Sequence, residues 1–457
     1  MSDVITIKKG FDIKLSGKAE DKLLSCSGKN YAIKPSDFVG LNPKLLIQEG
    51  DRVKAGGKVF CSKKDENLIF SSPVSGVVKS INRGEKRFIE SIVIEDDLTN
   101  EYEDFGKFSL ENMQNEEVEN KLLQSGLWTL IRQRPFSTIA NYEKKPKCII
   151  ISGFASYPLA PDYNFTLKGR GEQLQKGVDA LKKVADVPIY LCTDYEKTYC
   201  DELLLLKNVE IKRFKGEHPY GNVSVLISRI DPINKGDIVW YVDAEDLAII
   251  GDFFITNRVD KQKVIALCGA MVEKPCYLKV KVGAQIADIV GDNIKKDKKI
   301  RYISGNILSG EKVDRDGFLG TYDNLVTLIE EGDYYEFLGW ALPGNNKFSL
   351  HRTFISGFFN LLPKKYRKTY SVDTNLHGGK RAFVLTGDFE RVMPLDIYPL
   401  ELIKACIIGD IDKMEELGIY EVDSEDFALC EVIDVSKTNI QQIVKDALEQ
   451  IRKEVEQ

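Results

Sequence analysis

The chain has 457 residues, of which 43% are hydrophobic and 29% charged, a composition typical of a soluble globular protein long enough for about three domains. Its formal net charge of -6 gives no dominant basic field, which argues against a primary role in nucleic-acid binding. No apolar run approaches the length that spans a bilayer, and residues 1–10 lack the apolar stretch of a signal peptide. We therefore expect a cytosolic protein that reaches a membrane only through partners.

The first expected domain, residues 1–104, is organised around residues 43–81. This stretch contains two similar halves, each with a tight turn that leads into a short alternating strand. The turns are Gly56-Gly57 and residues 72–76, SPVSG, where glycine allows positive φ and proline fixes the turn. Short alternating runs with turns at this density predict a small antiparallel β barrel. The pattern resembles the barrel-sandwich of biotinyl and lipoyl carrier domains.

A carrier domain needs one exposed lysine at a hairpin tip, which would here be Lys63 or Lys64, followed by Asp65. The methionines or acid that usually flank a modified lysine are missing. Two interpretations remain open: a solvated lysine turn on a docking or scaffold module, which we favour, or a lysine-modified carrier protein.

The second expected domain, residues 105–272, combines helices and buried strands. Residues 110–126 repeat apolar side chains at helical spacing and stop at Gly126. Further on, a helix at 169–184 lies among strands expected at 147–152, 187–193, 209–214, 237–243 and 263–269. This alternation predicts a doubly wound, Rossmann-like unit. Gly169 and Gly171 lack the spacing of a dinucleotide-binding loop, so we expect an ordinary helix entry there.

The remaining chain divides into two further expected domains. Residues 273–344 alternate strand, short helix and strand, which suggests a β-grasp (SLBB-like) unit. Residues 345–457 form a helical C-terminal domain, with helices expected at 395–408 and 438–455. The nine cysteines are scattered without any C-x-x-C pair, so we expect no metal site in this chain. The fold class is therefore multidomain α/β.

Six blocks of sequence, taken together and in order, carry a resemblance to a known family. They are ITIKKGFDIKLSG, PKLLIQEGDRVKAGG, FSSPVSGVVKSINRGEKR, LLQSGLWTLIRQRPFS, LPGNNKFSLHRTF and GDFERVMPLDIYPLELIKACIIGD. Over essentially the whole chain, they resemble the A-subunit family of the sodium-translocating NADH:quinone reductases. The architecture is also similar to the C subunit of the Rnf complex and to the flavin-binding subunit of complex I.

Those more distant relatives carry a glycine-rich loop, G-x-G-G-x-G-F-P-T, whose bare backbone approaches flavin and nucleotide phosphates. The corresponding stretch here, residues 127–138, reads LWTLIRQRPFST. Its bulky side chains would fill the space that glycines leave open, so the resemblance implies that FMN and NADH do not bind there. In the tail, the Rnf relative has clustered cysteines, whereas only Cys430 remains here. We therefore expect a ferredoxin-like remnant without iron–sulfur cysteines, in which Cys430 is packed.

The resemblance implies a peripheral subunit on the cytoplasmic face of the bacterial inner membrane. The whole complex belongs to the respiratory chain: it passes electrons from NADH to ubiquinone or menaquinone and exports sodium. Its FMN, FAD, riboflavin and Fe–S centres belong to other subunits, so this chain is expected to bind none of them. The implied partners are the B to F subunits, especially the membrane-embedded B subunit, together with quinone.

The former nucleotide loop is our candidate for quinone contact, with Trp128, Arg132, Arg134, Pro135 and Phe136 as the candidate residues. Aromatic and apolar side chains can stack on a quinone ring, and an arginine can donate a hydrogen bond to its carbonyl. Two alternatives stay open. Trp128 and Phe136 plug a vacated pocket, or the chain is purely a structural scaffold. No nucleophile–base pair stands out, so no catalytic residue is assigned.

Overall fold

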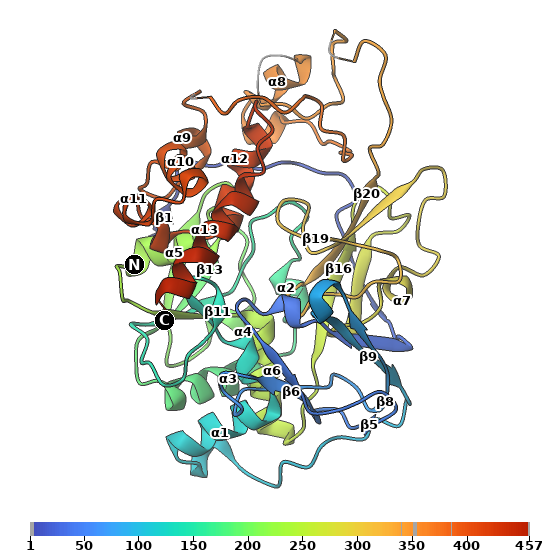
Figure 1. Cartoon of the computed structure of the whole chain (residues 1–457), viewed down its shortest axis with the longest axis vertical. Coiled ribbons are helices and arrows are strands. Elements are labelled where there is room, and N and C mark those ends of the chain that lie inside the picture. Colours follow the sequence, from blue (N-terminus) through green and yellow to red (C-terminus); the bar gives the residue numbers. More distant parts are fainter. Residues whose placement is uncertain (1–3, 340, 351–353, 385, 456–457) are drawn as a thin grey trace.

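The structure is a computed structural model that describes residues 4–339, 341–350, 354–384 and 386–455. The chain builds a mixed α/β molecule in which the barrel strands lie at one end and a group of C-terminal helices covers one side (Figure 1). None of the helices in these ranges is long and apolar enough to cross a membrane.

The barrel unit consists of two small antiparallel sheets. One contains β3 (Asn30–Ile33), β9 (Ile89–Asp96), β8 (Gly76–Arg83) and β5 (Arg52–Val53), and the other contains β4 (Pro43–Leu45), β6 (Lys58–Ser62) and β7 (Ile69–Ser71). Buried side chains from these strands, such as Val59, Phe70 and Ile92, belong to one shared core. The predicted antiparallel β unit is confirmed.

The α/β unit is built on a seven-stranded sheet in the order β1-β14-β13-β12-β15-β10-β11. Its parallel strands are β1 (Val4–Thr6), β12 (Ile149–Ser152), β13 (Ile189–Asp194), β14 (Glu210–Lys215) and β15 (Val239–Asp243). The antiparallel edge is made by β10 (Arg132–Arg134) and β11 (Thr138–Ile139). The N-terminal strand β1 thus completes this sheet, although we had expected residues 4–15 in the barrel domain.

Helices cover both faces of this sheet, as parallel strands require. Ile149 and Ile151 pack with α1 (Asn115–Ser125), α3 (Gly171–Val184) and α6 (Ala244–Thr256). Ile150 faces the opposite side, where α5 (Val223–Ile230) and the C-terminal helices lie. Period-two alternation along one buried strand therefore assigns neighbouring residues to two separate cores.

The third unit is a six-stranded sheet in the order β19-β18-β20-β16-β17-β2. Its strands are β2 (Glu20–Ser25), β16 (Gln262–Cys268), β17 (Cys276–Lys281), β18 (Ile300–Ser304), β19 (Glu311–Val313) and β20 (Leu325–Glu330), and α7 (Ile286–Val290) packs on it. Our assignment of residues 263–269 to the α/β sheet was wrong, because β10 already occupies the edge of β15. The strand β16 instead pairs antiparallel with β17 through a short connection.

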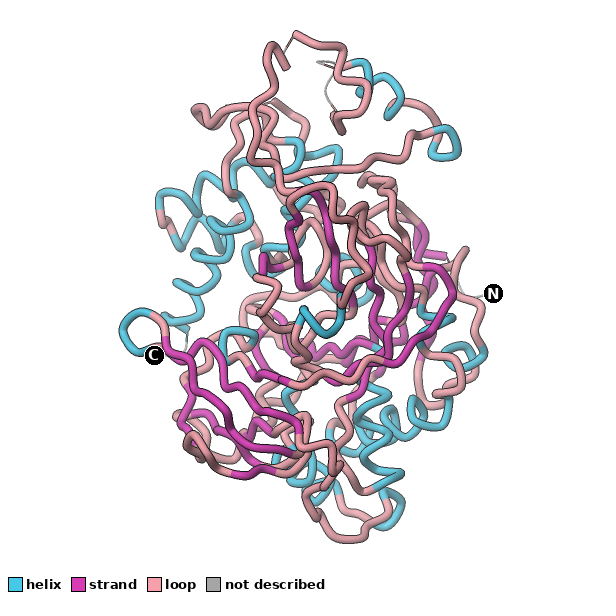
Figure 2. The backbone as a smooth tube through the Cα atoms, turned by 90° about the vertical axis from the view of Figure 1, so that its right-hand side faces the viewer, coloured by secondary structure: helices cyan, strands magenta, loops and turns pink. Residues whose placement is uncertain are grey.

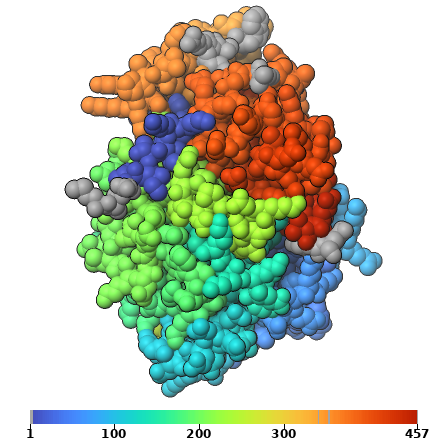
Figure 3. Space-filling model, turned by 90° about the vertical axis from the view of Figure 1, so that its left-hand side faces the viewer, coloured from blue at the N-terminus to red at the C-terminus, as the bar shows by residue number. Residues whose placement is uncertain are grey.

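The C-terminal region is helical. Its elements are α8 (Ile355–Asn360), α9 (Phe389–Val392), α10 (Pro399–Ile408), α11 (Ile411–Glu416), α12 (Ala428–Ile433) and α13 (Ile440–Val455). The two predicted helices correspond to α10 and α13. The α8 region forms one extremity of the molecule in Figure 2. Figure 3 shows the N-terminal segment, in dark blue, between the α/β unit and the C-terminal region.

Candidate functional site

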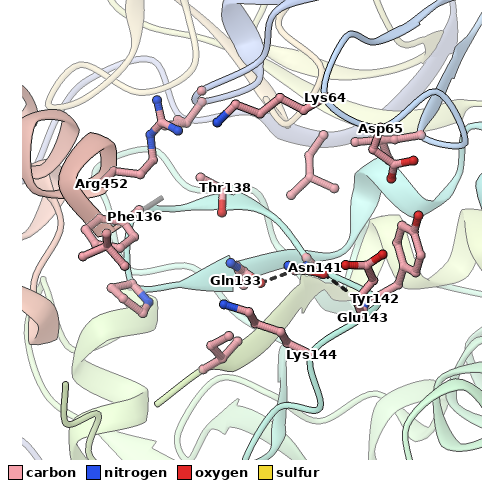
Figure 4. A pocket seen from close by; sticks show the side chains of 18 of the residues that line it. Lys64, Asp65, Gln133, Phe136, Thr138, Asn141, Tyr142, Glu143, Lys144 and Arg452 are labelled. Atoms are coloured by element: carbon pink, nitrogen blue, oxygen red, sulfur yellow. Dashed lines mark hydrogen bonds between the residues drawn. The ribbon is translucent and has the colours of Figure 1, made fainter. Parts of the chain in front are cut away.

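A cavity of about 830 Å³ opens where the barrel, the β10–β11 edge and the last helix meet (Figure 4). Its walls come from the barrel loops at 39–41 and 62–68, the β10–β11 hairpin, the loop before β15, and α13. Segments more than 400 residues apart in the sequence thus line one space. The lining residues used below are Gly40, Lys64, Gln133, Pro135, Phe136, Thr138, Ile139, Tyr142, Lys144, Tyr420 and Arg452.

The barrel contributes the tip of the β6–β7 hairpin. Lys63 and Lys64 are exposed at this tip, and Lys64 with Asp65 lines the cavity. In Figure 4, Lys64 and Arg452 extend toward each other along one side of the space. This hairpin tip therefore faces another part of the same chain, rather than extending away from it.

Arg452 of α13 closes the cavity against the barrel. Its guanidinium donates two hydrogen bonds to Glu449, at 2.9 and 2.7 Å, and is almost fully buried. Gly40 has φ of +75°, and a Cβ atom there would lie 2.6 Å from Cζ of Arg452. The left-handed backbone conformation favours glycine at this point, and any side chain there would displace the guanidinium of Arg452.

The β10–β11 hairpin forms the opposite wall. Its backbone reverses through Phe136 and Ser137, both with positive φ, which non-glycine residues rarely adopt. The Phe136 ring meets Tyr420 of the C-terminal unit edge-on, with centroids 6.0 Å apart. The side-chain oxygen of Gln133 accepts a hydrogen bond of 2.8 Å from the backbone N–H of Asn141 and so ties down the end of the hairpin.

The structure divides the five candidate quinone contacts into two groups. Pro135 and Phe136 line the cavity, whereas Trp128, Arg132 and Arg134 do not. Trp128 is fully buried, and its indole N–H donates a 2.7 Å hydrogen bond to the carbonyl oxygen of Ala140. Its ring lies edge-on to Tyr142 and Trp240, so it supports the cavity wall from behind.

The guanidinium of Arg132 lies between two tyrosine rings. Its Cζ atom is 4.6 Å from the ring centroid of Tyr241 on β15 and 4.2 Å from that of Tyr322 in the third unit. Such cation–π contacts contribute about 2 kcal/mol each when desolvated. The hydroxyl of Tyr322 in turn donates a 2.7 Å hydrogen bond to the carbonyl oxygen of Thr129. Arg132 therefore joins the α/β unit to the third unit.

Arg134 makes the corresponding link to the C-terminal unit. Its buried guanidinium forms ion pairs with Asp423 and with Glu425, the latter at 2.8 Å. Burial alone would raise the pKa of Asp423, but Arg134 and the hydroxyl of Ser137 hold that pKa below its ordinary value. Burial outweighs Arg134 at Glu425 and raises the pKa of that carboxyl to about 7.

A second space of about 610 Å³ lies at the carboxyl ends of β12 and β13, the edge where α/β sheets commonly bind ligands. Tyr157 and Tyr163 enter it, and Tyr163 donates a 2.6 Å hydrogen bond to Asp243 at the end of β15. Asp243 and the neighbouring Glu245 are buried carboxyls whose pKa values burial raises to about 6 and about 8. Lysines and carboxylates both line this space, among them Lys14, Lys197 and Asp194.

Two further expectations concern helix entry and metal binding. The backbone N–H of Gly169 donates a 2.7 Å hydrogen bond to Glu202, and α3 begins at Gly171 as an ordinary helix. Cys430 is fully buried, as expected. Within the described ranges, no group of three or more His, Cys, Asp or Glu side chains could hold a metal ion.

Sequence reasoning missed the residues that complete the cavity from a distance, notably Gly40, Tyr142, Tyr420 and Arg452. The helical period of residues 438–455 predicts a helix, but nothing in it indicates that Arg452 meets a barrel glycine. The available signal was weak: Gly40 lies in a turn, where glycine is common for local reasons.

Three domain families match this chain. Residues 5–97 match the NqrA N-terminal barrel-sandwich hybrid domain, and residues 113–259 match the NqrA second alpha/beta domain. Residues 264–315 match the family described as the NQRA C-terminal domain.

Full-length relatives have the same order of segments. The chain is 36% identical to the A subunit of the Na(+)-translocating NADH-quinone reductase of Haemophilus influenzae over 458 aligned residues, which cover 99% of this chain and 100% of the relative. The subunits of the same name from Yersinia pseudotuberculosis and Pasteurella multocida are 34% and 35% identical, again over 99% of this chain and 100% of each relative.

A solved structure of an NAD+-reducing [NiFe]-hydrogenase in the air-oxidized state shows a weaker similarity. It aligns with a TM-score of 0.39 and 13% identity, covering 76% of this chain and 65% of that one. This value is too low to support an argument about function.

Proposed function

This chain belongs to the NqrA family, the A subunits of the Na+-translocating NADH-quinone reductases, and on that premise we propose that it supplies a quinone-contact surface to such a complex. The complex is an oxidoreductase and a sodium translocase, named for NADH as donor and quinone as acceptor. We assign no catalytic residue to this chain.

The remaining parts of the proposal follow the same premise. The chain lies at the cytoplasmic face of the bacterial inner membrane, held by the B to F subunits and above all by the membrane-embedded B subunit. Ubiquinone or menaquinone is the acceptor. FMN, FAD, riboflavin and iron–sulfur centres are carried by other subunits.

The domain interpretation is retained in the same way. The barrel is assigned to residues 1–104 except β1 and β2, which join the other two sheets, and the Rossmann-like unit to 105–272 except β16, which joins the third sheet. The β-grasp (SLBB-like) unit is assigned to residues 273–344 and the helical remnant to 345–457. The order β14-β13-β12-β15 supports the second of these, because it places the first strand of the unit beside the fourth. The Lys63 and Lys64 carrier alternative is not favoured, since the hairpin tip faces the cavity.

The observation that carries the quinone proposal is the composition of the cavity wall. Ligand pockets commonly enclose roughly 300–1,000 Å³ and combine apolar walls with a few polar groups. Here Pro135, Phe136 and Ile139 provide apolar surface, and the hydroxyl of Thr138 and the ammonium of Lys144 extend into the space (Figure 4). A flat ring can pack on Phe136 while its carbonyl oxygens accept from these donors.

The five predicted residues then have two roles. Pro135 and Phe136 contact the quinone. Trp128, Arg132 and Arg134 are positioning residues that fix the hairpin against Ala140, Tyr322 and the C-terminal carboxylates.

The test uses the assembled complex with Phe136→Ala in this chain. Loss of the stacking surface should raise the KM for a short-chain ubiquinone at least about fivefold, while NADH oxidation by an artificial acceptor stays unchanged. Phe88→Ala is the matched control, because Phe88 is a half-exposed barrel phenylalanine outside the cavity wall.

An unchanged KM for quinone in Phe136→Ala would overturn the contact role and leave the chain with a scaffold role only. Loss of both activities together would also count against the proposal, since it would show that Phe136 supports assembly. Gel filtration of the variant complex separates that outcome from a specific effect on quinone.

A further inference from the structure

Residues 337–372 have a charge pattern unlike the rest of the chain. They contain six Lys or Arg residues and no Asp or Glu, although the whole chain has a formal net charge of -6. The same stretch is rich in Phe, Leu and Tyr. It carries α8, which lies at one extremity of the molecule in Figures 1 and 2.

Helix α8 exposes apolar side chains and buries small and polar ones, which is the reverse of an ordinary surface helix. It buries Ser356, Gly357 and Asn360, while Phe358 is 56% exposed and Leu361, just after its end, 55% exposed. Ile355, Phe359 and Leu362 are also exposed. A contiguous apolar group of this kind on a single chain marks a surface that another partner covers.

The helix is held in this orientation by specific contacts. The side-chain amide of Asn360 donates a 2.7 Å hydrogen bond to the carbonyl oxygen of Ser349, and its oxygen accepts a 3.2 Å bond from the hydroxyl of Tyr370. Arg367 anchors the next segment through a 2.9 Å ion pair with Glu217 of the α/β unit. The outward apolar face is therefore a fixed feature of the fold.

A basic run follows the apolar group directly. Residues 363–368 read PKKYRK. Lys364 pairs with Asp12 and Arg367 with Glu217, and the structure gives Lys365 and Lys368 no acidic partner among the described residues. The aromatic ring of Tyr366 is 64% exposed between them.

From this combination we propose that α8 and the basic run after it, here called the α8 knuckle (residues 355–368), dock directly on an anionic lipid bilayer. Apolar side chains of this size enter the headgroup boundary, tyrosine favours that depth, and lysines attract acidic headgroups. A protein partner is the weaker candidate, because lysine is depleted from the centres of protein interfaces. The inference does not depend on quinone contact at the cavity.

The test is co-sedimentation of the purified full chain with quinone-free vesicles of phosphatidylcholine containing about one third phosphatidylglycerol, compared with phosphatidylcholine alone. The chain should bind the anionic vesicles, bind neutral ones much less, and dissociate at high salt. Phe358→Glu with Leu361→Glu should lower the bound fraction at least about tenfold, and Lys365→Glu with Lys368→Glu should do the same.

Matched controls carry the same changes elsewhere. Leu205→Glu with Ile408→Glu replaces two exposed apolar residues outside the α8 knuckle, and Lys54→Glu with Lys58→Glu replaces two exposed barrel lysines. Both should bind vesicles like the unaltered chain, and circular dichroism checks that every variant is folded. Failure of the unaltered chain to bind, or equal binding by the knuckle variants, overturns the proposal. Loss of a knuckle variant from the complex without any vesicle binding would overturn it in favour of a protein partner.

Discussion

Arg134 is a buried charge whose partners come from a different unit of the molecule. It lies on β10, and its ion pairs with Asp423 and Glu425 reach the C-terminal unit. Breaking such a pair by removing one partner leaves uncompensated buried charge, which is more costly than the pair is stabilising. Arg134 therefore fixes the β10–β11 hairpin beside the cavity against the C-terminal unit.

We expect Arg134→Met to lower the free energy of unfolding by about 3–5 kcal/mol, since Asp423 would lose the guanidinium that holds its pKa down. Urea unfolding at neutral pH measures this change. The control is Arg52→Met, whose exposed pairs with Asp97 and Glu101 should contribute less than about 1 kcal/mol. If both variants lost the same free energy of unfolding, the buried pair would stabilise the chain no more than an exposed pair does.

Glu245 makes stability depend on pH. It is 2% exposed, and burial, followed by the neighbouring Asp243, raises the pKa of its carboxyl from 4.5 to about 8. The folded chain therefore binds this proton more tightly than the unfolded chain. The resulting stability is fully present below pH 4.5 and is lost as the pH rises toward 8.

Glu245→Gln keeps the neutral shape and removes the titration. The variant should match the unaltered chain near pH 5 and exceed its stability by on the order of 3 kcal/mol near pH 8. Thermal unfolding across this range measures the difference, and Glu90→Gln on the exposed barrel surface is the control. A constant difference between variant and unaltered chain at all pH values would contradict the assignment.

Among the elements, α1 shows how one glycine joins a helix to a sheet. The predicted stop at Gly126 is confirmed, with φ of +73° at the helix end. Its second role was invisible in the sequence: a Cβ atom there would lie 2.6 Å from the Ser71 hydroxyl and 2.9 Å from its backbone nitrogen. Both the left-handed conformation and the close approach to β7 therefore select glycine.

Gly126→Ala should destabilise the chain by about 2–4 kcal/mol, combining the conformational cost with overpacking against β7. Gly169→Ala is the matched control, because its φ is +78° and nothing lies within 4 Å of the added Cβ. It should cost only about 1 kcal/mol. Equal losses, measured by urea unfolding, would show that the contact with Ser71 is unimportant.

Sequence reasoning succeeded for elements whose signal is local. Alternation predicted the barrel strands, buried runs predicted β12 to β15, and helical periodicity predicted α10 and α13. It failed for β16, since whether a strand joins a sheet depends on which edge is free, and β10 fills the edge of β15. It also failed for β1, whose partner β14 lies about 200 residues away.

For the whole molecule, the same limit applies to the site. The sequence identifies residues 127–138 as a loop that has lost the glycines of its more distant relatives. It does not show which of their side chains face a cavity. Arg132 and Arg134 have the charge expected of ligand contacts, yet their partners Tyr322 and Asp423 come from other units. A single sequence gives residue types and spacing, while the cavity depends on how the barrel, the α/β unit and the C-terminal unit pack together.

The contact between Gly40 and Arg452 tests that packing directly. Gly40→Ala would strain a residue with φ of +75° and push the guanidinium of Arg452 away from the barrel, so the contact between α13 and the barrel should loosen. We expect faster backbone hydrogen exchange in residues 440–455 and in the cavity loop at 62–68.

Gly50→Ala is the matched control within the barrel, because its φ is +91° and nothing lies within 4 Å of the added Cβ. Unchanged exchange at α13 in Gly40→Ala would mean that the barrel and the last helix are held together elsewhere. If a short-chain quinone slows the exchange of Gly40→Ala back to the rate of the unaltered chain, the interface is linked to the ligand. A molecule that fills the cavity stabilises the closed arrangement of its walls.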